Sequence, residues 1–436
     1  MSTMNKYKNL KVAVLGLGIE GSDAVKYLLS MGARVSLFDQ KPESEIDFGG
    51  IKKNSLNLYL GPKYNLKLLK DFDAVVRSPG VYRYLPEIVD AEKSGTEITS
   101  PIKIFFEECP GKIIGVTGTK GKGTTSTLIY ETLKSDSRDV YLAGNIGKPY
   151  LELLPRLDKE SIVILEMSSF QLIDMNVSPN IAVVLNITAD HMDWHKDIEE
   201  YVNAKKNIVL FQKPSDFAVI NEEYDVPRNF AESIKSKIIF FSKNKLDSKF
   251  KTKLLLRGEH NLENIAAAVA VAKILKVDEK KIGKVIRNFK GLEHRLELVG
   301  SVKGIAFYND SFATGPQPTI AAIKSFTEPE TLILGGSDKW LDYSELGDVV
   351  NHRANIKNII LIGTTASKIG GFLKKNLGFR ILNLGFSSMD KIVKKAFEAT
   401  EKGGVVVLSP ASASFDMFEN YKDRGNQFKE AVRKLK

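Results

Sequence analysis

Short apolar runs alternate with amphipathic stretches along almost the whole chain. Several runs end in Gly, Ser, Asp or Asn, at the point where the next amphipathic stretch begins. This alternation predicts parallel β-sheets flanked by helices, an α/β fold, and argues against a β-sandwich or a helical bundle. The runs are KVAVLGLG (11–18), RVSLFD (34–39), DAVVRSPG (73–80), IIGVTGT (113–119), SIVILEMS (161–168), IAVVLNIT (181–188), IAFYND (305–310), TLILGG (331–336), NIILIG (358–363) and GVVVLSPA (404–411).

Turn residues near Ser100–Pro101 and Lys290–Gly291 separate complete sets of strand-like and helix-like segments. A chain of 436 residues is long enough for two to four domains of roughly 100–200 residues each. We therefore expect three α/β domains, at residues 1–102, 103–292 and 293–436. Ligands of open α/β sheets bind at the carboxyl ends of the strands, so the polar residues that close the runs are the first candidates for binding sites.

The composition argues against several classes of protein. The chain is 43% apolar and 27% charged, and no stretch approaches the roughly 18 uninterrupted apolar residues of a membrane span, so a cytoplasmic protein with no membrane partner is expected. The net charge is +10, but Lys and Arg are scattered among acidic residues without an aromatic-basic motif. That pattern favours phosphate-bearing small substrates over nucleic acid. The single cysteine, Cys109, precedes Pro110 and is expected to be an inert thiol.

The first block carries the sequence GLGIEG at 16–21, between a strand-like run and a helix-like stretch, and Asp39 closes the next run. This is the pattern of a dinucleotide-type loop, in which glycines let the backbone approach a phosphate at a helix N-terminus. Taken by itself, the pattern leaves open a phosphate-binding loop, an NAD-dependent oxidoreductase and a purely structural tight turn.

The second block opens with a glycine-rich loop, GVTGTKGKGTT at 115–125, between a strand-like and a helix-like segment. Its glycines free backbone N–H groups to face phosphate oxygens, and Lys122 supplies a point charge for the terminal phosphates of ATP. Gly123 follows the lysine, so the hydroxyl that binds Mg²⁺ has to come from Thr124 or Thr125.

Carboxylate and imidazole groups close two further runs of this block. Glu166 ends SIVIL, and the sequence DHMDWH at 190–195 follows IAVVLNIT. These side chains at neighbouring strand ends predict a site for a hard cation. A zinc site using His191 and His195 is the alternative, although no third soft ligand has fitting spacing. The chain's other clustered histidines are His260 and His294.

Ordered motifs along residues 11–428 resemble those of the Mur ligase family. Besides the loop at 115–125 and DHMDWH they are GNIG (144–147), LEMSSFQL (165–172), YVNAKKNI (201–208), GEHNLEN (258–264), LEHRLE (292–297), YNDSFAT (308–314), GGSDK (335–339) and SPASASFD (409–416). The resemblance implies a Rossmann-like N-terminal domain, a central P-loop ATPase-type domain and a C-terminal Rossmann-like domain. Their order is most similar to the branch that adds D-glutamate to UDP-N-acetylmuramoyl-L-alanine in peptidoglycan precursor synthesis.

The resemblance also assigns substrate sites, residue by residue. The UDP substrate would contact Gly18, Ile19, Glu20, Asp39, Gln40, Ser78, Pro79, Gly80 and Asn145. ATP would contact Gly118, Thr119, Lys120, Gly121, Lys122, Gly123, Thr124, Thr125, His260, Asn261, Asn264, Arg295 and Asp310. The amino acid would contact Thr314, Lys339, Ser414 and Tyr421.

Two Mg²⁺ ions are implied, with Thr124, Glu166, His191 and Lys205 as candidate ligands; Lys122, Glu166, His191 and Lys205 form the catalytic set. Lys205 matches the lysine that the family carbamylates, a change that turns a cation into an anionic oxygen ligand. Because carbamylation requires a neutral amine, we expect Lys205 to be partly buried and its pKa to be lowered.

The implied reaction is ATP-driven: the acceptor carboxylate becomes an acyl phosphate, which the amino acid then attacks. Its partners are the small substrates alone, and a monomer is expected. The chain departs from the pattern at Phe312, where D-glutamate-adding members often have lysine, and at Trp340, where smaller residues are common. Gly123–Thr124 resembles the loop of folylpolyglutamate synthases, which keeps that related ligase as an alternative.

Overall fold

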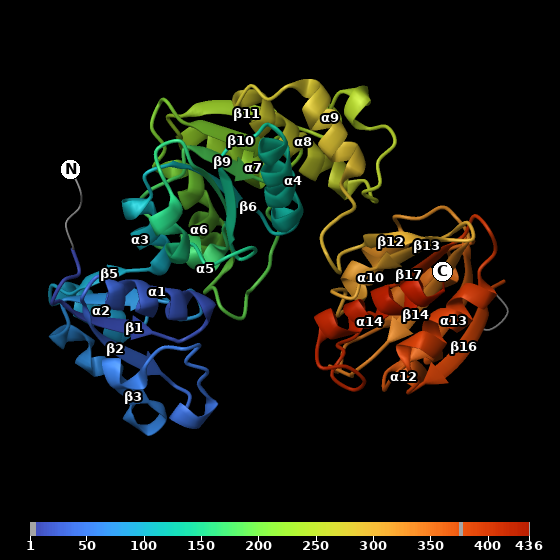
Figure 1. Ribbon diagram of the computed structural model, residues 1–436, viewed down its shortest axis with the longest axis horizontal. Helices are drawn as coiled ribbons and strands as arrows, with labels where there is room; N and C mark the ends of the chain where they lie inside the picture. Colours follow the sequence, from blue (N-terminus) through green and yellow to red (C-terminus); the bar gives the residue numbers. More distant parts are fainter. Residues whose placement is uncertain (1–5, 375–377, 436) are drawn as a thin grey trace. The chain divides into compact units, whose positions relative to one another are not determined.

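The structure of this protein is a computed structural model that describes residues 6–374 and 378–435. The chain forms two compact units. Residues up to 246 together with 263–282 make the first, and residues 247–262 together with 283 to the end make the second. Figure 1 colours the chain along its sequence, so that the first sheet is blue, the second teal to yellow, and the third orange to red.

The first sheet is built from five parallel strands in the order β3-β2-β1-β4-β5. Its central strands are apolar on both faces, as β1 shows with four consecutive buried residues, because helices cover both sides of a parallel sheet. The elements are β1 (Lys11–Leu15), α1 (Ile19–Ser30), β2 (Arg34–Asp39), β3 (Asn57–Leu60), β4 (Ala74–Arg77), α2 (Pro86–Lys93) and β5 (Glu97–Thr99).

The second sheet, in the same unit, has six parallel strands in the order β11-β10-β9-β6-β8-β7. Ser100 caps α3 by accepting a hydrogen bond from the N–H of Lys103, and Pro101 occupies the first helical position. The elements are α3 (Pro101–Glu108), β6 (Lys112–Thr117), α4 (Lys122–Ser135), β7 (Val140–Gly144), β8 (Ile162–Glu166), α5 (Ser169–Leu172), β9 (Ile181–Val184), α6 (Ile198–Leu210), β10 (Phe217–Asn221), α7 (Asp225–Phe230), β11 (Lys237–Phe241), α8 (His260–Ile274) and α9 (Glu279–Asn288).

The third sheet lies in the second unit and has the order β12-β13-β17-β14-β15-β16. The strands of this sheet are parallel, as predicted, except β12, which pairs antiparallel with β13. Only Lys303 and Gly304 link the two strands, both at positive φ, and so short a hairpin can join only antiparallel neighbours. The elements are β12 (Glu297–Val302), β13 (Ile305–Asn309), α10 (Pro316–Ile323), β14 (Glu330–Gly335), α11 (Ser344–Asn351), β15 (Ile356–Ile362), α12 (Ala366–Gly371), β16 (Arg380–Gly385), α13 (Met389–Ala399), β17 (Val405–Leu408) and α14 (Tyr421–Lys434).

The predicted α/β class is confirmed, and each apolar run of the sequence forms a strand. The domain boundaries at residues 102 and 292 stay a prediction. Within the described residues, no helix combines the length and apolar character that crossing a membrane requires.

Glu330, the first residue of β14, is fully buried, and neither of its carboxyl oxygens has a hydrogen-bond partner. Burial raises its pKa to about 8, against the opposing charge of Arg353. A carboxyl group whose pKa is raised in the folded state contributes stability below its unfolded pKa and loses that contribution as the pH rises through the folded pKa.

The free energy of unfolding of the parent protein should therefore fall between about pH 5 and pH 8, and we expect this fall to be smaller in Glu330→Gln. At pH 9 the variant should be more stable than the parent by on the order of 1–3 kcal/mol, because a buried charge is avoided. Urea unfolding at both pH values, with hydrogen exchange of the β14 amides as local readout, measures this. Glu401→Gln, at an exposed position of the same unit, is the control, and parallel pH profiles for all three proteins would contradict the argument.

Candidate functional site

The carboxyl ends of the strands of the first sheet surround a cavity of about 700 Å³. Every residue predicted to contact the UDP substrate lines this cavity, except Asn145. Tyr64, Tyr82, Asp193 and Trp194 line it as well, so the cavity includes two residues of the DHMDWH motif from the second sheet's half of the unit.

Backbone contacts fix the shape of the glycine loop at 16–21. A Cβ atom on Gly21 would lie 1.9 Å from the carbonyl oxygen of Gly16, so only glycine allows α1 to start this close to β1. The N–H of Leu17 donates to Asp39 Oδ2 (3.0 Å), and Ser78 Oγ donates to Gly16 O (2.8 Å). Asp39 therefore organises the loop as well as lining the cavity.

Glu20 connects this loop to the second half of the unit. Its carboxylate accepts hydrogen bonds from the hydroxyl of Tyr150 and from Gln171 Nε2. Burial raises the pKa of Glu20 to about 7, and these two bonds only partly offset the effect. Asn145 lies apart from the cavity, exposed, with its N–H donating to the carbonyl of Glu166 (3.2 Å).

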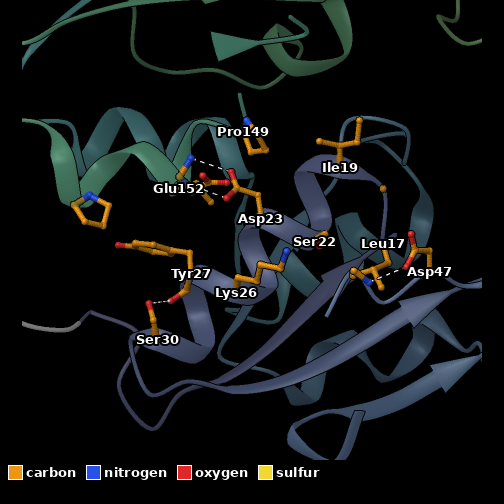
Figure 2. A pocket seen from close by; sticks show the side chains of 14 residues that line it. Leu17, Ile19, Ser22, Asp23, Lys26, Tyr27, Ser30, Asp47, Pro149 and Glu152 are labelled. Carbon is orange, nitrogen blue, oxygen red and sulfur yellow. Dashed lines mark hydrogen bonds between the residues drawn. The ribbon is translucent and has the colours of Figure 1, made fainter. Parts of the chain in front are cut away.

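A second cavity, of about 640 Å³, opens on the other side of the loop between α1 and residues 149–155 (Figure 2). It shares Leu17, Gly18 and Ile19 with the first cavity. Asp23 lines this cavity. Its carboxylate accepts hydrogen bonds from the backbone N–H groups of Leu151 (2.9 Å) and Glu152 (3.1 Å), which fixes α1 against residues 149–155.

The phosphate loop runs from the end of β6 to the start of α4, as the sequence predicts. Gly121 precedes the helix with φ +87°, a left-handed conformation that favours glycine. The N–H of Lys120 donates to Asn186 Oδ1 (3.0 Å), and Lys122 Nζ donates to the carbonyls of Gly118 (2.9 Å) and Thr119 (3.1 Å). The lysine thus lies over the loop whose N–H groups would face a phosphate.

The structure distinguishes between the two threonines at the start of α4. Thr125 is fully buried, and its hydroxyl donates to Asn264 Oδ1 (3.2 Å) on α8. Thr124 is partly exposed. The hydroxyl that is accessible to a metal ion is therefore that of Thr124, and Gly123 is buried between the helix and its neighbours.

Lys205 on α6 is 2% exposed, and its Nζ donates to the carbonyl of Gly118 (3.0 Å) and lies 4.8 Å from the centre of the Tyr201 ring. Burial, reinforced by the charge of Lys122, holds the pKa of Lys205 well below its ordinary value, although Asp190 and Glu166 oppose the shift. The expectation that this lysine is partly buried with a lowered pKa is confirmed, with burial nearly complete, and its amine is neutral far more readily than that of a surface lysine.

The two histidines of DHMDWH have different environments. His191 is exposed, at φ +57°, with its ring 4.8 Å from that of Phe170. His195 is buried, and its ring nitrogens lie 2.9 Å from Ser169 Oγ and 3.1 Å from Glu200 Oε2. Because both nitrogens of His195 are engaged, the zinc alternative loses its second ligand. In the part of the chain that the structure describes, no group of three His, Cys, Asp or Glu side chains is arranged for a metal.

The remaining donors suit a hard cation. Glu166, 8% exposed, stands at the end of β8 and pairs in register with Gly144 of β7 and Val116 of β6. Its carboxylate and the hydroxyl of Thr124 are oxygen ligands of the kind that Mg²⁺ prefers. Neither LEMSSFQL nor the phosphate loop GVTGTKGKGTT contains a cysteine that could supply a thiol ligand. The residues present therefore fit Mg²⁺.

The first residues of α8, up to 262, belong to the second unit, and the rest of the helix belongs to the first. His260 and Asn261 belong to the second unit, where Asn261 Nδ2 donates to the carbonyl of Arg257 (2.5 Å), and Asn264 belongs to the first. The ATP residues predicted from GEHNLEN are thus distributed over both.

In the second unit, Asp310 follows β13 and is 8% exposed. Its oxygens accept bonds from Ser409 Oγ (2.7 Å) and from the N–H of Leu296 (3.0 Å), and burial raises its pKa to about 7. Asp310 therefore shapes the turn that carries Arg295. The exposed guanidinium of Arg295 lies 4.1 Å from the ring centre of Phe312, which in turn meets Tyr421 edge-on.

Of the predicted amino-acid residues, Thr314, Lys339 and Ser414 lie on the loops that follow β13, β14 and β17, and Tyr421 is the first residue of α14. Lys339 is exposed and Ser414 is 2% exposed, while Thr314 and Tyr421 are partly exposed. Trp340, beside Lys339, is 90% exposed at φ +59°. The rim of this sheet is therefore both basic and aromatic.

Two buried arginines were not identified from sequence patterns. Arg424 on α14 donates to the carbonyls of Ser311, Ser412 and Ala413, so it joins the YNDSFAT and SPASASFD loops. Arg77 has a comparable role beside the first cavity. A charged residue that closes an apolar strand, as in AVVR, is the signal that would have indicated Arg77.

Comparisons with known proteins agree with the motifs. Residues 10–100 match the N-terminal domain of MurD-like Mur ligases, and residues 116–253 match the Mur ligase middle domain. A protein of Acetivibrio thermocellus named UDP-N-acetylmuramoylalanine–D-glutamate ligase is 42% identical over an alignment 458 positions long, gaps included, which covers 99% of this chain and 97% of that protein. A protein of the same name from Clostridium tetani is 38% identical, covering 98% and 97% of the respective chains.

Solved structures share the fold. UDP-N-acetylmuramate-alanine ligase MurC from Thermotoga maritima gives a TM-score of 0.59 at 17% identity, with 98% of this chain and 100% of that chain covered. The MurF ligase from Thermotoga maritima, in complex with ADP, gives 0.57 at 18% identity, with 100% and 98% covered. At such identities the likeness concerns the fold alone.

Replacement of Lys122 by alanine should abolish nearly all ATP-dependent turnover while the fold survives, because it removes the ammonium group that lies over the phosphate loop, where it donates to the carbonyls of Gly118 and Thr119. Phosphate release measures turnover, and the melting temperature reports the fold. Lys134→Ala, at an exposed position near the end of the same helix, is the matched control. Normal turnover in Lys122→Ala would remove the phosphate loop from the mechanism.

Proposed function

The chain belongs to the Mur ligase family of ATP-dependent, amide-forming ligases, and from this premise we propose that it joins D-glutamate to UDP-N-acetylmuramoyl-L-alanine. The observation that carries the proposal is the similarity, at 37–42% identity over nearly the full chain, to proteins named for that reaction. Membership of this family removes the oxidoreductase interpretation of the glycine loop.

The proposed reaction has two steps. The γ-phosphoryl group of ATP passes to the carboxylate oxygen of the alanyl group, which gives an acyl phosphate and ADP. The amino group of D-glutamate then attacks the acyl carbon, so that a C–N bond forms, the C–O bond to phosphate breaks, and the nitrogen loses a proton. Because the chemistry is carried by ATP, the protein contributes chiefly position and charge.

The proposal assigns these tasks to residues of the first unit. The cavity beside β1 and β4 would bind the uridine diphosphate, and Lys122 would neutralise the terminal phosphates of ATP. Thr124, Glu166 and His191 would bind Mg²⁺. When bound, Mg²⁺ reduces the negative charge that builds up on the transferred phosphoryl group.

Carbamylation of Lys205 is part of the proposal. The neutral amine of Lys205 would attack CO₂, forming an N–C bond and losing one proton, to give a carbamate anion. Lys205 lies close enough to Lys122, Asp190 and Glu166 for their charges to act on it. A carbamate there would supply an oxygen ligand for a second Mg²⁺ and would place an anion beside Lys122 in place of a second cation.

Phosphate release with UDP-N-acetylmuramoyl-L-alanine, ATP and a panel of amino acids tests the function. We expect release with D-glutamate and little with other amino acids. Turnover with a folate acceptor and glutamate instead would favour the folylpolyglutamate synthase alternative, which needs no UDP site. No ATP consumption with any amine would refute the proposal. The panel is needed because Phe312 and Trp340 depart from the family's usual residues.

Lys205→Ala should lose most of the activity, and short carboxylates such as acetate should restore part of it by supplying the missing anionic oxygen ligand. Lys206→Ala, at the next position of α6, is the control. Intact-protein mass spectrometry under neutral conditions should detect the carbamate on the parent protein and not on Lys205→Ala. Absence of both the adduct and the rescue would contradict carbamylation while leaving the ligase reaction intact.

A further inference from the structure

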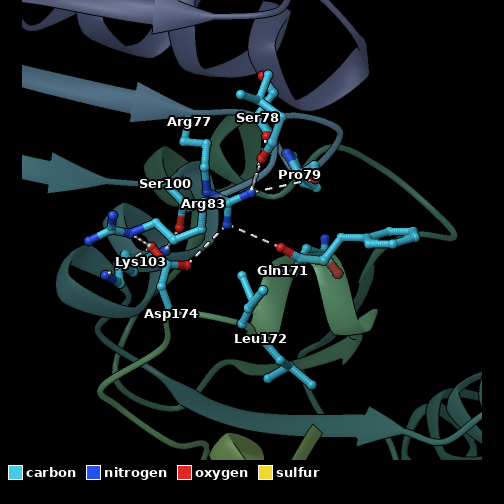
Figure 3. Close-up of polar contacts among 12 residues, drawn as sticks. Arg77, Ser78, Pro79, Arg83, Ser100, Lys103, Gln171, Leu172 and Asp174 are labelled. Carbon is cyan, nitrogen blue, oxygen red and sulfur yellow. Dashed lines mark hydrogen bonds and ion pairs between the residues drawn. The ribbon is translucent and has the colours of Figure 1, made fainter. Parts of the chain in front are cut away.

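Arg77 ends β4, and its side chain is fully buried (Figure 3). Nη1 of its guanidinium donates to the carbonyl oxygens of Ser78 (3.3 Å), Pro79 (3.4 Å) and Val81 (2.8 Å). All three of these residues line the cavity of the first sheet. The guanidinium therefore supports one wall of that cavity from behind, without lining the cavity itself.

The other terminal nitrogen of Arg77 binds the segment that follows β8. Nη2 donates to the carbonyl of Phe170 (3.1 Å) and to Asp174 Oδ1 (3.0 Å). The ring of Phe170 lies 4.8 Å from that of His191 and 4.5 Å from that of Trp194. One side chain thus connects the cavity wall to the segments on which Glu166 and His191 are found.

Trp194 forms a second, weaker link between the same two parts. Its Nε1 donates to the carbonyl of Gly80 (3.3 Å), in the middle of the cavity wall. Both links come from residues outside the glycine loop and the phosphate loop, so neither is explained by the binding of a phosphate.

Asp174 supplies the countercharge that burial of Arg77 requires. Its side chain is 6% exposed and also pairs with Arg83 (3.2 Å) and Lys103 (3.4 Å). Burial alone would raise the pKa of Asp174, but Arg77, Lys103 and Arg83 together lower it, so the carboxylate stays ionised. A lysine at position 77 would keep the charge, but a single nitrogen with three protons cannot serve five acceptors.

We propose that Arg77 is a positioning residue for the reaction. It fixes the Ser78–Val81 wall relative to the Phe170–His191 segment, so that a nucleotide-sugar bound at the wall presents its carboxylate in register with the phosphoryl-transfer site. This inference rests on the proposed function. Arg77 acts through the backbone that it binds and does not contact the substrate.

The test compares Arg77→Lys with Arg83→Lys. Both changes keep a buried cation near Asp174, but Arg83 has no hydrogen bond to the Ser78–Val81 wall among the described contacts. We expect Arg77→Lys to raise the KM for the UDP substrate by about tenfold or more and to lower kcat, with the KM for ATP unchanged within about twofold. Arg83→Lys should leave all three constants near those of the parent protein.

A binding measurement separates this inference from the proposed function. In a Trp340→Phe background, Trp194 is the remaining tryptophan, and it lines the cavity. Titration with UDP, followed by its fluorescence, should give a higher Kd for Arg77→Lys than for its parent. If the parent protein binds UDP but never releases phosphate, the proposed function is refuted. The UDP titration would still test whether Arg77 positions the cavity wall.

Three results would overturn the inference: an unchanged KM for the UDP substrate, equal changes in the KM values for ATP and the UDP substrate, or the same losses in Arg83→Lys. If Arg77→Lys does not fold, Trp194→Phe replaces it, since that change removes the bond to Gly80 and keeps an aromatic ring beside Tyr82, Phe170 and His195. Trp194→Phe should raise the KM for the UDP substrate by a smaller factor than loss of the five Arg77 hydrogen bonds. An unchanged KM for the UDP substrate in Trp194→Phe would refute the proposed link between the cavity wall and the phosphoryl-transfer site.

Discussion

Hydrogen bonds from buried basic side chains to backbone carbonyls, at the carboxyl ends of the strands, are the interaction that organises the three candidate sites. Arg77 binds the wall of the first cavity, Lys205 binds Gly118 in the phosphate loop, and Arg424 binds the loops that follow β13 and β17. A buried cation is costly unless it is paired, so each one fixes the carbonyls around it in a narrow range of positions. These side chains therefore hold the backbone of the loops at the strand ends in place.

The number of partners separates the structural cations from the reactive one. Arg77 and Arg424 donate to several oxygens each, and although burial lowers the pKa of Arg424 to about 10, the group stays charged at neutral pH. Lys205 donates to the carbonyl of Gly118, which also accepts a hydrogen bond from Lys122. Too few partners and a neighbouring charge of the same sign make the neutral amine the favoured form, and a neutral amine is a nucleophile.

Sequence patterns predicted the interior of the fold better than its margins. Apolar runs indicated every interior strand except β10, but none of the edge strands β3, β5, β7, β11, β12 and β16. An edge strand has one neighbour and more solvent, as the mostly exposed β11 shows, so its composition carries a weaker signal. Among site residues, contiguous motifs located Lys122, Glu166 and Lys205. The sequence patterns did not identify Arg77 and Arg424. Both arginines bind backbone carbonyls of segments that are far apart in the sequence, and a backbone carbonyl is present at every position, so no residue pattern marks these contacts.

The carboxyl groups near the binding regions are arranged so that little negative charge reaches the substrates, which are themselves anions. Asp39 accepts backbone N–H groups, and burial raises the pKa values of Glu20 and Asp310 to about 7, so these two are partly protonated at neutral pH. Each acid still accepts the hydrogen bonds that shape its loop. Within each unit, the field of the basic side chain, Lys122 in the first and the exposed Arg295 in the second, is therefore weakened less than the number of nearby acids would suggest, and an ATP-driven ligase needs that positive charge for its anionic nucleotide.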